Sequence, residues 1–133
     1  MTERNSDTTL KIITVDDSPV IAKRLKELLD DVGGVELMGN AETIKTALEV
    51  IEQSQPHVVF LDINLAHDKP RNGIDLLNAL RKMYPVMKII MLTNLSDSRY
   101  REMCRSIGAD YFFDKSDDFD RIPDTLASIR LEN

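Results

Sequence analysis

Polar side chains stand directly after apolar runs of this sequence, at the points where buried strands would end. They are Asp16, Asp17, Asp62, Thr93, Asp114 and Lys115. Three of these carboxylates, brought together, would repel one another strongly unless a cation lay among them, and hard oxygen ligands suit Mg²⁺. A lysine and a hydroxyl beside them would each hold one oxygen of an anion. The residue types therefore indicate a magnesium-dependent phosphoryl site, with Asp16, Asp17 and Asp62 at the metal and Thr93 and Lys115 at the anion.

The apolar runs before these residues are typical of strands buried on both faces. Residues 12–15, 58–61 and 88–92 are continuous runs rather than alternating ones, which favours a parallel sheet covered by helices. Residues 35–38 and 111–113 are weaker candidates for two further strands.

Five segments with apolar residues at helical spacing separate or follow these runs. Their apolar positions span residues 21–32, 44–51, 74–83, 100–107 and 119–129. Ser18 and Pro19 are typical of the start of the first helix, Gly33 indicates its end, and Pro123 must lie in the first turn of the fifth. Alternating strands and helices with right-handed crossovers predict a doubly wound α/β sandwich of three layers. Ligands bind such sheets where the strands end, so the polar residues listed above should meet at one edge.

Length and composition limit the classes of protein to consider. With 133 residues, of which 42% are hydrophobic and 30% charged, the chain has the size and composition of one globular domain. The net charge of −6 disfavours direct binding to nucleic acid or to an anionic membrane, and no apolar run is long enough to span one. A single cysteine, Cys104, excludes an internal disulfide, and the polar residues 1–9 predict a flexible tail rather than a signal peptide. We therefore expect a cytoplasmic protein.

The order and spacing of five of the polar residues resemble those of a known family. The five are Asp16 and Asp17 after the first strand, Asp62 in Val-Val-Phe-Leu-Asp-Ile-Asn, Thr93 at the end of the fourth strand, and Lys115 after Gly-Ala-Asp-Tyr-Phe-Phe-Asp. Over residues 10–131 the sequence is similar to the receiver domains of two-component response regulators. The resemblance implies a flavodoxin-like receiver fold, in which a five-stranded parallel sheet with the strand order 2-1-3-4-5 is flanked by five helices.

The resemblance also implies a role for each carboxylate. Asp62 would be the phospho-acceptor, taking a phosphoryl group from a phosphohistidine of a sensor histidine kinase or a histidine phosphotransfer protein. Asp17, Asp62 and the main-chain carbonyl of Asn64 would bind Mg²⁺ directly, whereas Asp16 would act mainly through bound water. The chain would have no enzymatic activity beyond this self-catalysed phosphotransfer and autodephosphorylation.

The remaining residues of the pattern imply a switch. Lys115 would pair with the phosphoryl group, and Thr93 would donate a hydrogen bond to it after a shift of its loop. Phe112 matches the position of an aromatic ring that changes its burial as the threonine moves. A downstream protein would then bind the surface formed by the fourth helix, the fifth strand and the fifth helix, because added charge at Asp62 biases a two-state surface. The arginines of the fourth helix are either part of that surface or simply solvated.

The sequence departs from the family pattern at four places. Ten residues separate Asp62 from Gly73, which is a longer loop than usual. Ser116 follows Lys115 where proline is common, so we expect no cis peptide bond there, because cis is costly for other residues. Asn94 replaces a small residue, and Phe112 lacks the hydroxyl of the tyrosine that is common at that position. The departures affect phosphoryl lifetime and output rather than the essential groups.

Three alternatives remain open. A phosphatase of the haloacid dehalogenase class would use similar groups, but its nucleophile normally begins an Asp-x-Asp motif after the first strand, whereas Asp62 follows the third and has Asn64 two residues on. An inert receiver-like interaction module would not need all five functional residues. The chain could also be the receiver part of a larger DNA-binding regulator, although we expect no output domain within these 133 residues.

Overall fold

Five parallel strands form a single sheet in the order β2-β1-β3-β4-β5. The structure is a computed structural model and describes residues 9–132. The strands are β1 (Leu10–Val15), β2 (Val35–Ala41), β3 (Val58–Leu61), β4 (Lys88–Thr93) and β5 (Tyr111–Asp114). All five predicted strands and their order are confirmed. The flexible tail predicted for residues 1–9 falls, except for its last residue, outside the described residues.

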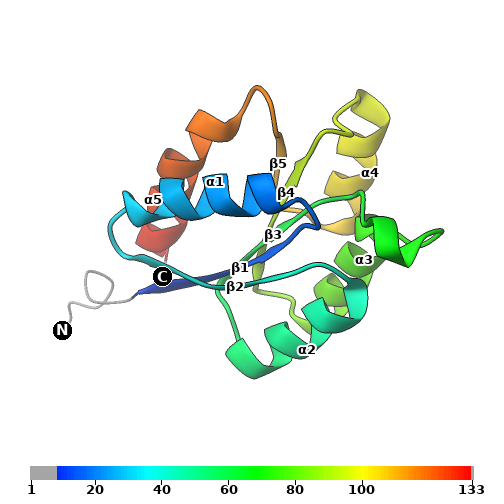
Figure 1. Ribbon diagram of the computed structural model, residues 1–133, viewed down its shortest axis with the longest axis horizontal. Coiled ribbons are helices and arrows are strands. Elements are labelled where there is room, and N and C mark those ends of the chain that lie inside the picture. Colours follow the sequence, from blue (N-terminus) through cyan, green and yellow to red (C-terminus); the bar gives the residue numbers. More distant parts are fainter. Residues whose placement is uncertain (1–8, 133) are drawn as a thin grey trace.

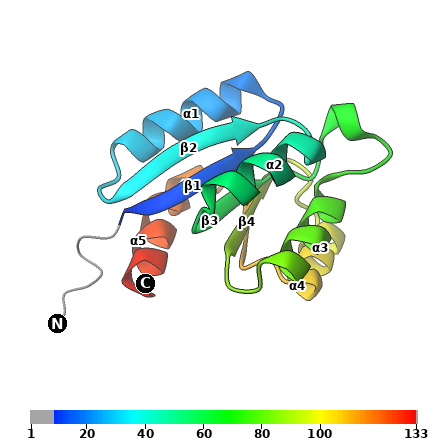
Figure 2. The same cartoon turned by 90° about the horizontal axis from the view of Figure 1, so that it is seen from below.

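Helices cover both faces of the sheet (Figures 1 and 2). They are α1 (Pro19–Asp30), α2 (Ile44–Ser54), α3 (Gly73–Met83), α4 (Ser98–Ile107) and α5 (Ile122–Glu132). Side chains of α1 and α5 form one buried cluster with the sheet, and side chains of α2, α3 and α4 form another on the opposite face. The predicted three-layer α/β sandwich is thus confirmed.

The central strands supply side chains to both clusters because neighbouring residues of a strand point to opposite faces. In β1, Ile12 packs beneath α1 and α5, while Ile13 packs against the other three helices. Phe60 and Leu61 of β3 divide in the same way. This burial on both sides explains why the runs are continuously apolar. By contrast, β2 is an edge strand whose burial alternates, and its sequence signal is correspondingly weaker.

The helix ends follow the predicted signals, with two differences. The Ser18 side chain accepts a hydrogen bond from the Ile21 N–H, and Pro19 occupies the first helical position. The α-helix ends at Asp30, before the last predicted apolar residue, Val32, whose N–H instead closes a turn onto the carbonyl of Leu29. The fifth helical segment begins with the 3₁₀ turn η3 (Phe119–Arg121), and α5 follows, with Pro123 in its first turn as expected.

Candidate functional site

Three buried ionic side chains meet where β1, β3 and β5 end. The Lys115 ammonium nitrogen lies 2.8 Å from Asp16 Oδ2 and 2.8 Å from Asp62 Oδ2. The exposed fractions of the three residues are only 5% for Asp16, 4% for Asp62 and 7% for Lys115. Each of them directly follows the last residue of its strand, so the sheet holds their backbones at its edge. The structure therefore brings together three of the predicted site residues.

The group of three combines two carboxyl groups with one ammonium group. Burial raises the pKa of Asp16, and the nearby Asp62 carboxylate acts in the same direction, although the hydrogen bond from Lys115 opposes both. For Lys115, burial on its own lowers the pKa, but the hydrogen bonds to Asp16 and Asp62 outweigh it and raise the pKa. Lys115 is therefore charged at neutral pH, and the carboxylate charges are only half compensated. The site is poised to take up a cation.

Asp17 lies at the same edge but points to a different partner. It is half-buried, and its Oδ2 accepts a hydrogen bond of 2.9 Å from the N–H of Ala66 in the loop after β3. Asp62 Oδ1 accepts a longer bond of 3.2 Å from the N–H of Asn64. The bond from Ala66 to Asp17 joins the loop after β1 to the loop after β3, whereas the bond from Asn64 to Asp62 lies within the second of these loops. Within residues 9–132, no three acidic, histidine or cysteine side chains are arranged as a metal cluster.

The donor set nevertheless fits a hard divalent cation. The carboxylates of Asp16, Asp17 and Asp62 and the main-chain carbonyl of exposed Asn64 supply only oxygen atoms, which is the ligand type of Mg²⁺. The excess negative charge of the buried group is a further reason for a cation there. The bond from Ala66 uses one oxygen of the Asp17 carboxylate, Oδ2.

Thr93 ends β4 beside this group and is fully buried. Its Oγ accepts a hydrogen bond of 3.2 Å from the N–H of Leu95, so the hydroxyl is tied to its own loop. Phe112, in the neighbouring strand β5, is half-buried and packs partly against the core beneath α4. Its register partner in β4 is Met91, two residues before Thr93. Both predicted switch residues thus lie on adjacent strands at the same end of the sheet.

Arg101 of α4 connects β5 with the loop after β4, and no pattern in the sequence predicts this contact. Its guanidinium lies 4.8 Å from the centre of the Phe112 ring, and its Nε donates a hydrogen bond of 3.0 Å to the carbonyl of Ser96. The Ser96 hydroxyl in turn bonds to the Asp114 carboxylate, which holds the pKa of Asp114 below its ordinary value. The loop after β4 is therefore joined to β5 by side chains that are distant in sequence.

Two of the departures from the family pattern, Ser116 and the long loop after Asp62, can be examined in the backbone near the site. Among the described residues, the cis peptide bond is Lys69–Pro70, and the Lys115–Ser116 bond is trans, as expected for serine in place of proline. The N–H of Ser116 instead donates to Asp114 Oδ1 at 2.7 Å. The long loop from Ile63 to Asn72 contains the 3₁₀ turn η2 (Ala66–Asp68), which the sequence did not predict.

Residues 12–127 match the family model described as the response regulator receiver domain. The chain belongs to this family. It is thus a receiver domain of two-component signal transduction, and response regulators receive phosphate from histidine kinases.

Curated relatives agree with this assignment. The chain is 36% identical over 123 residues to the sensory transduction protein LytT of Bacillus cereus, a match that covers 92% of this chain and 48% of that protein. It is 36% identical over 84 residues to the transcriptional regulatory protein LytR of Staphylococcus aureus, covering 63% of this chain and 33% of LytR. The receiver chain thus spans about half or less of the length of these relatives.

Solved structures share the receiver fold. The response regulator domain of Thermotoga maritima CheB is 25% identical, with a TM-score of 0.78 over 92% of this chain and 95% of that one. The isolated receiver domain of RcsB from Salmonella enterica serovar Typhimurium, with phosphomimetic BeF₃⁻, has a TM-score of 0.85 over 92% of this chain and 89% of that one. At 20% identity, the second likeness concerns the fold alone. No helix among residues 9–132 of the present receiver is long and apolar enough to cross a bilayer.

Proposed function

We propose that Asp62 of this receiver accepts a phosphoryl group from a phosphohistidine and that the resulting charge switches a protein-binding surface. The observation that carries the proposal is the buried group of Asp16, Asp62 and Lys115, in which one ammonium lies 2.8 Å from an oxygen of each carboxylate. A buried carboxylate of this kind needs partners to be stable, and these partners are the ones that phosphoryl transfer requires.

Each residue has a distinct part in the proposed reaction. A carboxylate oxygen of Asp62 attacks phosphorus directly, and a carboxylate nucleophile needs no general base. Lys115 leaves the ion pair with Asp62 to hold an oxygen of the transferred group, which keeps its positive charge at the site. Thr93, whose hydroxyl oxygen accepts from the N–H of Leu95, donates a hydrogen bond through its hydroxyl hydrogen to another phosphoryl oxygen after a shift of its loop. Positioning and charge neutralisation, rather than covalent help, are what this transfer demands.

A divalent cation, Mg²⁺ in our proposal, would be held by Asp17, Asp62 and the carbonyl of Asn64, with Asp16 acting mainly through bound water. When bound, it would neutralise the charge that the buried carboxylates share with the incoming phosphoryl group. The chain's own contribution is to keep these oxygen atoms at the rigid ends of β1 and β3.

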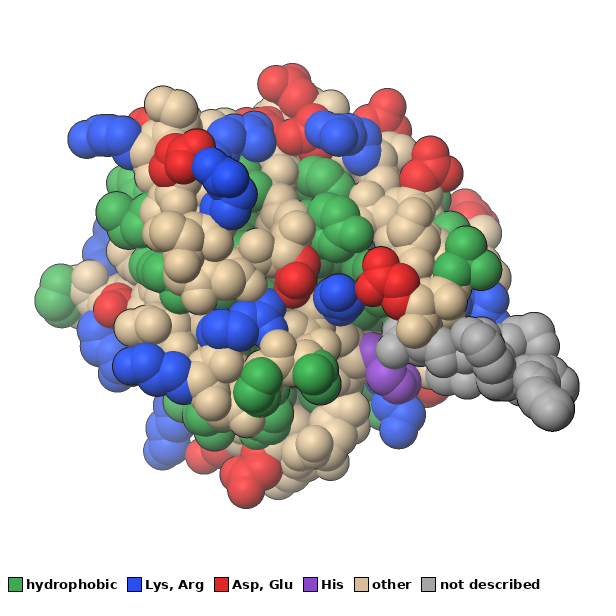
Figure 3. Space-filling view, turned by 180° about the vertical axis from the view of Figure 1, so that it is seen from behind, with side chains coloured by type: hydrophobic (Ala, Val, Ile, Leu, Met, Phe, Trp, Pro, Cys, Tyr) green, Lys and Arg blue, Asp and Glu red, His purple; other side chains and the backbone are tan. Residues whose placement is uncertain are grey.

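The output of the switch is proposed to be a protein contact at α4, β5 and α5. Arg101 and Phe112 lie on this surface and are joined to the loop after β4, so a shift of Thr93 would be transmitted there. On the face that Figure 3 shows, Lys and Arg side chains alternate with Asp and Glu. A mixed surface of this kind suits a protein partner better than nucleic acid. We further propose a cytoplasmic location, where sensor kinases expose their phosphohistidine.

The proposal is tested by incubating the full chain with acetyl phosphate and Mg²⁺ and measuring intact mass and peptide mass. We expect one added phosphoryl group, on Asp62, and none on the Asp62→Asn variant, because the amide is nearly isosteric but does not attack phosphorus. Asp97→Asn, which alters an exposed helix cap outside the site, serves as the control and should still be modified.

Two results would contradict the proposed function. Absence of modification in the wild type under any divalent cation would favour an inert interaction module. Sustained release of phosphate from many small esters, without a lasting modification at Asp62, would favour a phosphatase instead.

A further inference from the structure

A hollow of about 560 Å³ opens at the same edge of the sheet as the carboxylates. Its walls come from the segment after Asp62 and from the loop after Thr93. The lining residues are Ile63, Asn64, Leu65, Lys69, Pro70, Arg71, Asn72 and Leu95. Ile63 and Asn64 follow the proposed phospho-acceptor directly, so a molecule that reacts at Asp62 can extend into this hollow.

The loop that forms one wall is held in place despite its length. The Asp68 carboxylate accepts a hydrogen bond of 2.8 Å from the N–H of Ile44 at the start of α2, and the Ala66 N–H donates to Asp17. Leu65 is 1% exposed and belongs to the core, and the Arg71 N–H bonds to the carbonyl of Asp68. Figures 1 and 2 both show this segment, between β3 and α3, projecting beyond the sheet at the end where α1 begins.

Two cations stand on this fixed loop. The side chains of Lys69 and Arg71 line the hollow, are exposed, and have no ionic or hydrogen-bonding partner among residues 9–132. In the buried group, by contrast, the ammonium of Lys115 already has two ionic partners, Asp16 and Asp62. Lys69 and Arg71 thus place unpaired positive charge on the rim of the hollow, whereas the positive charge of the buried group is already paired.

We propose that Lys69 and Arg71 form a leaving-group subsite that favours small acyl phosphates as phosphoryl donors, an inference that rests on the proposed function of Asp62. In the transfer, an oxygen of Asp62 forms a bond to phosphorus while the bond from phosphorus to the bridging oxygen of the acyl phosphate breaks. The electron pair of that bond leaves with the carboxylate product. No proton is transferred and nothing is oxidised or reduced.

The position of the two cations follows from the geometry of such a displacement. The attacking and leaving atoms lie roughly in line with phosphorus, so the leaving group is on the side away from Asp62, toward the open rim. A carboxylate leaving group develops a full negative charge there, which Lys69 and Arg71 stabilise. Phosphoramidate transfers the same phosphoryl group but releases neutral ammonia, so the two cations give it no such advantage.

The test compares the two donors on the full chain with Mg²⁺ at low ionic strength. In the Lys69→Gln/Arg71→Gln variant we expect the phosphorylation rate with acetyl phosphate to fall about fivefold to tenfold, as for the loss of two exposed charges. With phosphoramidate the rate should stay within about twofold of the wild type. The difference between the donors should shrink at ~1 M salt, where exposed charges are screened.

A matched control changes the net charge equally at the other end of the molecule. Lys11→Gln/Lys82→Gln alters one residue near the start of β1 and one near the end of α3, and should leave both rates unchanged. Beryllofluoride, which mimics the phosphoryl group and has no leaving group, should bind the loop variant as it binds the wild type. That result would show that the site itself is intact.

Three results for the loop variant would contradict the proposed subsite. They are equal rate losses with both donors, an unchanged rate with acetyl phosphate, and a loss of beryllofluoride binding. These results differ from a failure of the proposed function, in which the wild type itself would take phosphate from neither donor at Asp62.

Discussion

At the scale of single residues, the site is a compromise between burial and charge. Asp16 and Asp62 share one ammonium, that of Lys115, in a place that is almost closed to water. One lysine balances one carboxylate, so the second carboxylate is uncompensated until a cation binds. We expect this excess charge to cost stability in the unmodified protein, and in the proposed function the same excess would attract a cation.

We expect the Asp16→Asn variant to be more stable than the wild type in the absence of divalent cations. The substitution leaves Asp62 and Lys115 as a matched pair and removes the carboxylate whose pKa is raised by burial. A carboxyl group with a raised pKa in the folded state binds more protons there, so its stabilising effect is present at low pH and is lost as the pH rises through the folded pKa. The gain in melting temperature should therefore be larger at about pH 7 than at about pH 4.

Thermal unfolding followed by circular dichroism measures this difference. Asp17→Asn is the matched control, because Asp17 lies at the same edge but is half-buried and outside the ion pairs, so it should give no comparable gain. Addition of Mg²⁺ should stabilise the wild type more than the Asp16→Asn variant. A lower melting temperature for Asp16→Asn at neutral pH would show that the interpretation of the buried group is wrong.

At the scale of elements, the start of α3 fixes the position of Asp62. The N–H of Gly73 donates a hydrogen bond of 2.7 Å to the carbonyl of Ile63, which brings the helix end against the backbone that carries Asp62, the proposed phospho-acceptor. A Cβ atom at position 73 would lie 2.0 Å from the carbonyl oxygen of Asp62. The glycine is required by this close approach of two backbones.

We expect Gly73→Ala to destabilise the fold by about 1 to 3 kcal/mol, the usual cost of forcing extra atoms into a packed region. Phosphorylation at Asp62 should slow as well, because the displaced segment carries the nucleophile. Urea unfolding and the rate with acetyl phosphate provide the two measurements. Gly33→Ala is the control, since nothing lies within 4 Å of the Cβ that it would add. Equal stability of the two variants would contradict the argument.

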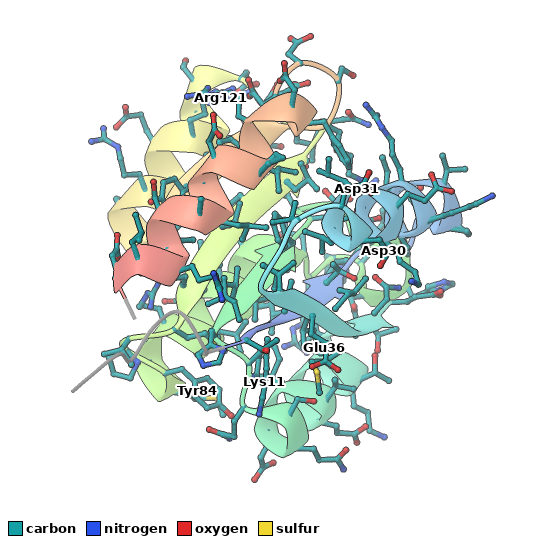
Figure 4. The ribbon with its side chains drawn as sticks, turned by 90° about the vertical axis from the view of Figure 1, so that its left-hand side faces the viewer. Lys11, Asp30, Asp31, Glu36, Tyr84 and Arg121 are labelled. Atoms are coloured by element: carbon teal, nitrogen blue, oxygen red, sulfur yellow. The ribbon has the colours of Figure 1, made fainter. Side chains whose placement is uncertain are left out.

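At the scale of the whole molecule, the amino ends of the strands form an edge opposite to the site (Figure 4), where Lys11 and Tyr84 lie. There the N–H of Lys11 donates a hydrogen bond of 2.8 Å to Nδ1 of His57, which joins the start of β1 to the segment before β3. Nδ1 accepts this bond only when it carries no proton. Burial lowers the pKa of His57, and the charge of Lys11 lowers it further.

We expect the free energy of unfolding to fall as the pH drops through about 6.5, the ordinary value for histidine. Since the pKa is lowered in the folded state, the unfolded chain binds more protons in this range, and the stability is fully present only above it. His57→Asn should remove most of this dependence, because the amide oxygen can accept the same bond and does not titrate. His67→Asn, in the exposed loop, should leave the pH dependence of the free energy of unfolding unchanged. An identical pH dependence in both variants would refute the role of His57.

The sequence by itself determined the order of the elements and the identity of the site. Burial on both sides of the sheet requires continuous apolar runs, and the polar residues that follow each run then lie at the carboxyl edge. Asp62, Thr93 and the pair Asp114 and Lys115 could therefore be predicted from the sequence. Only the tertiary structure decided which side chains touch. The sharing of Lys115 by two carboxylates, the bond from Ala66 to Asp17 and the contact of Arg101 with Phe112 join residues that are far apart in sequence. Such contacts depend on how loops and helices pack over the sheet edge. The spacing of apolar residues along the chain carries no information about that packing.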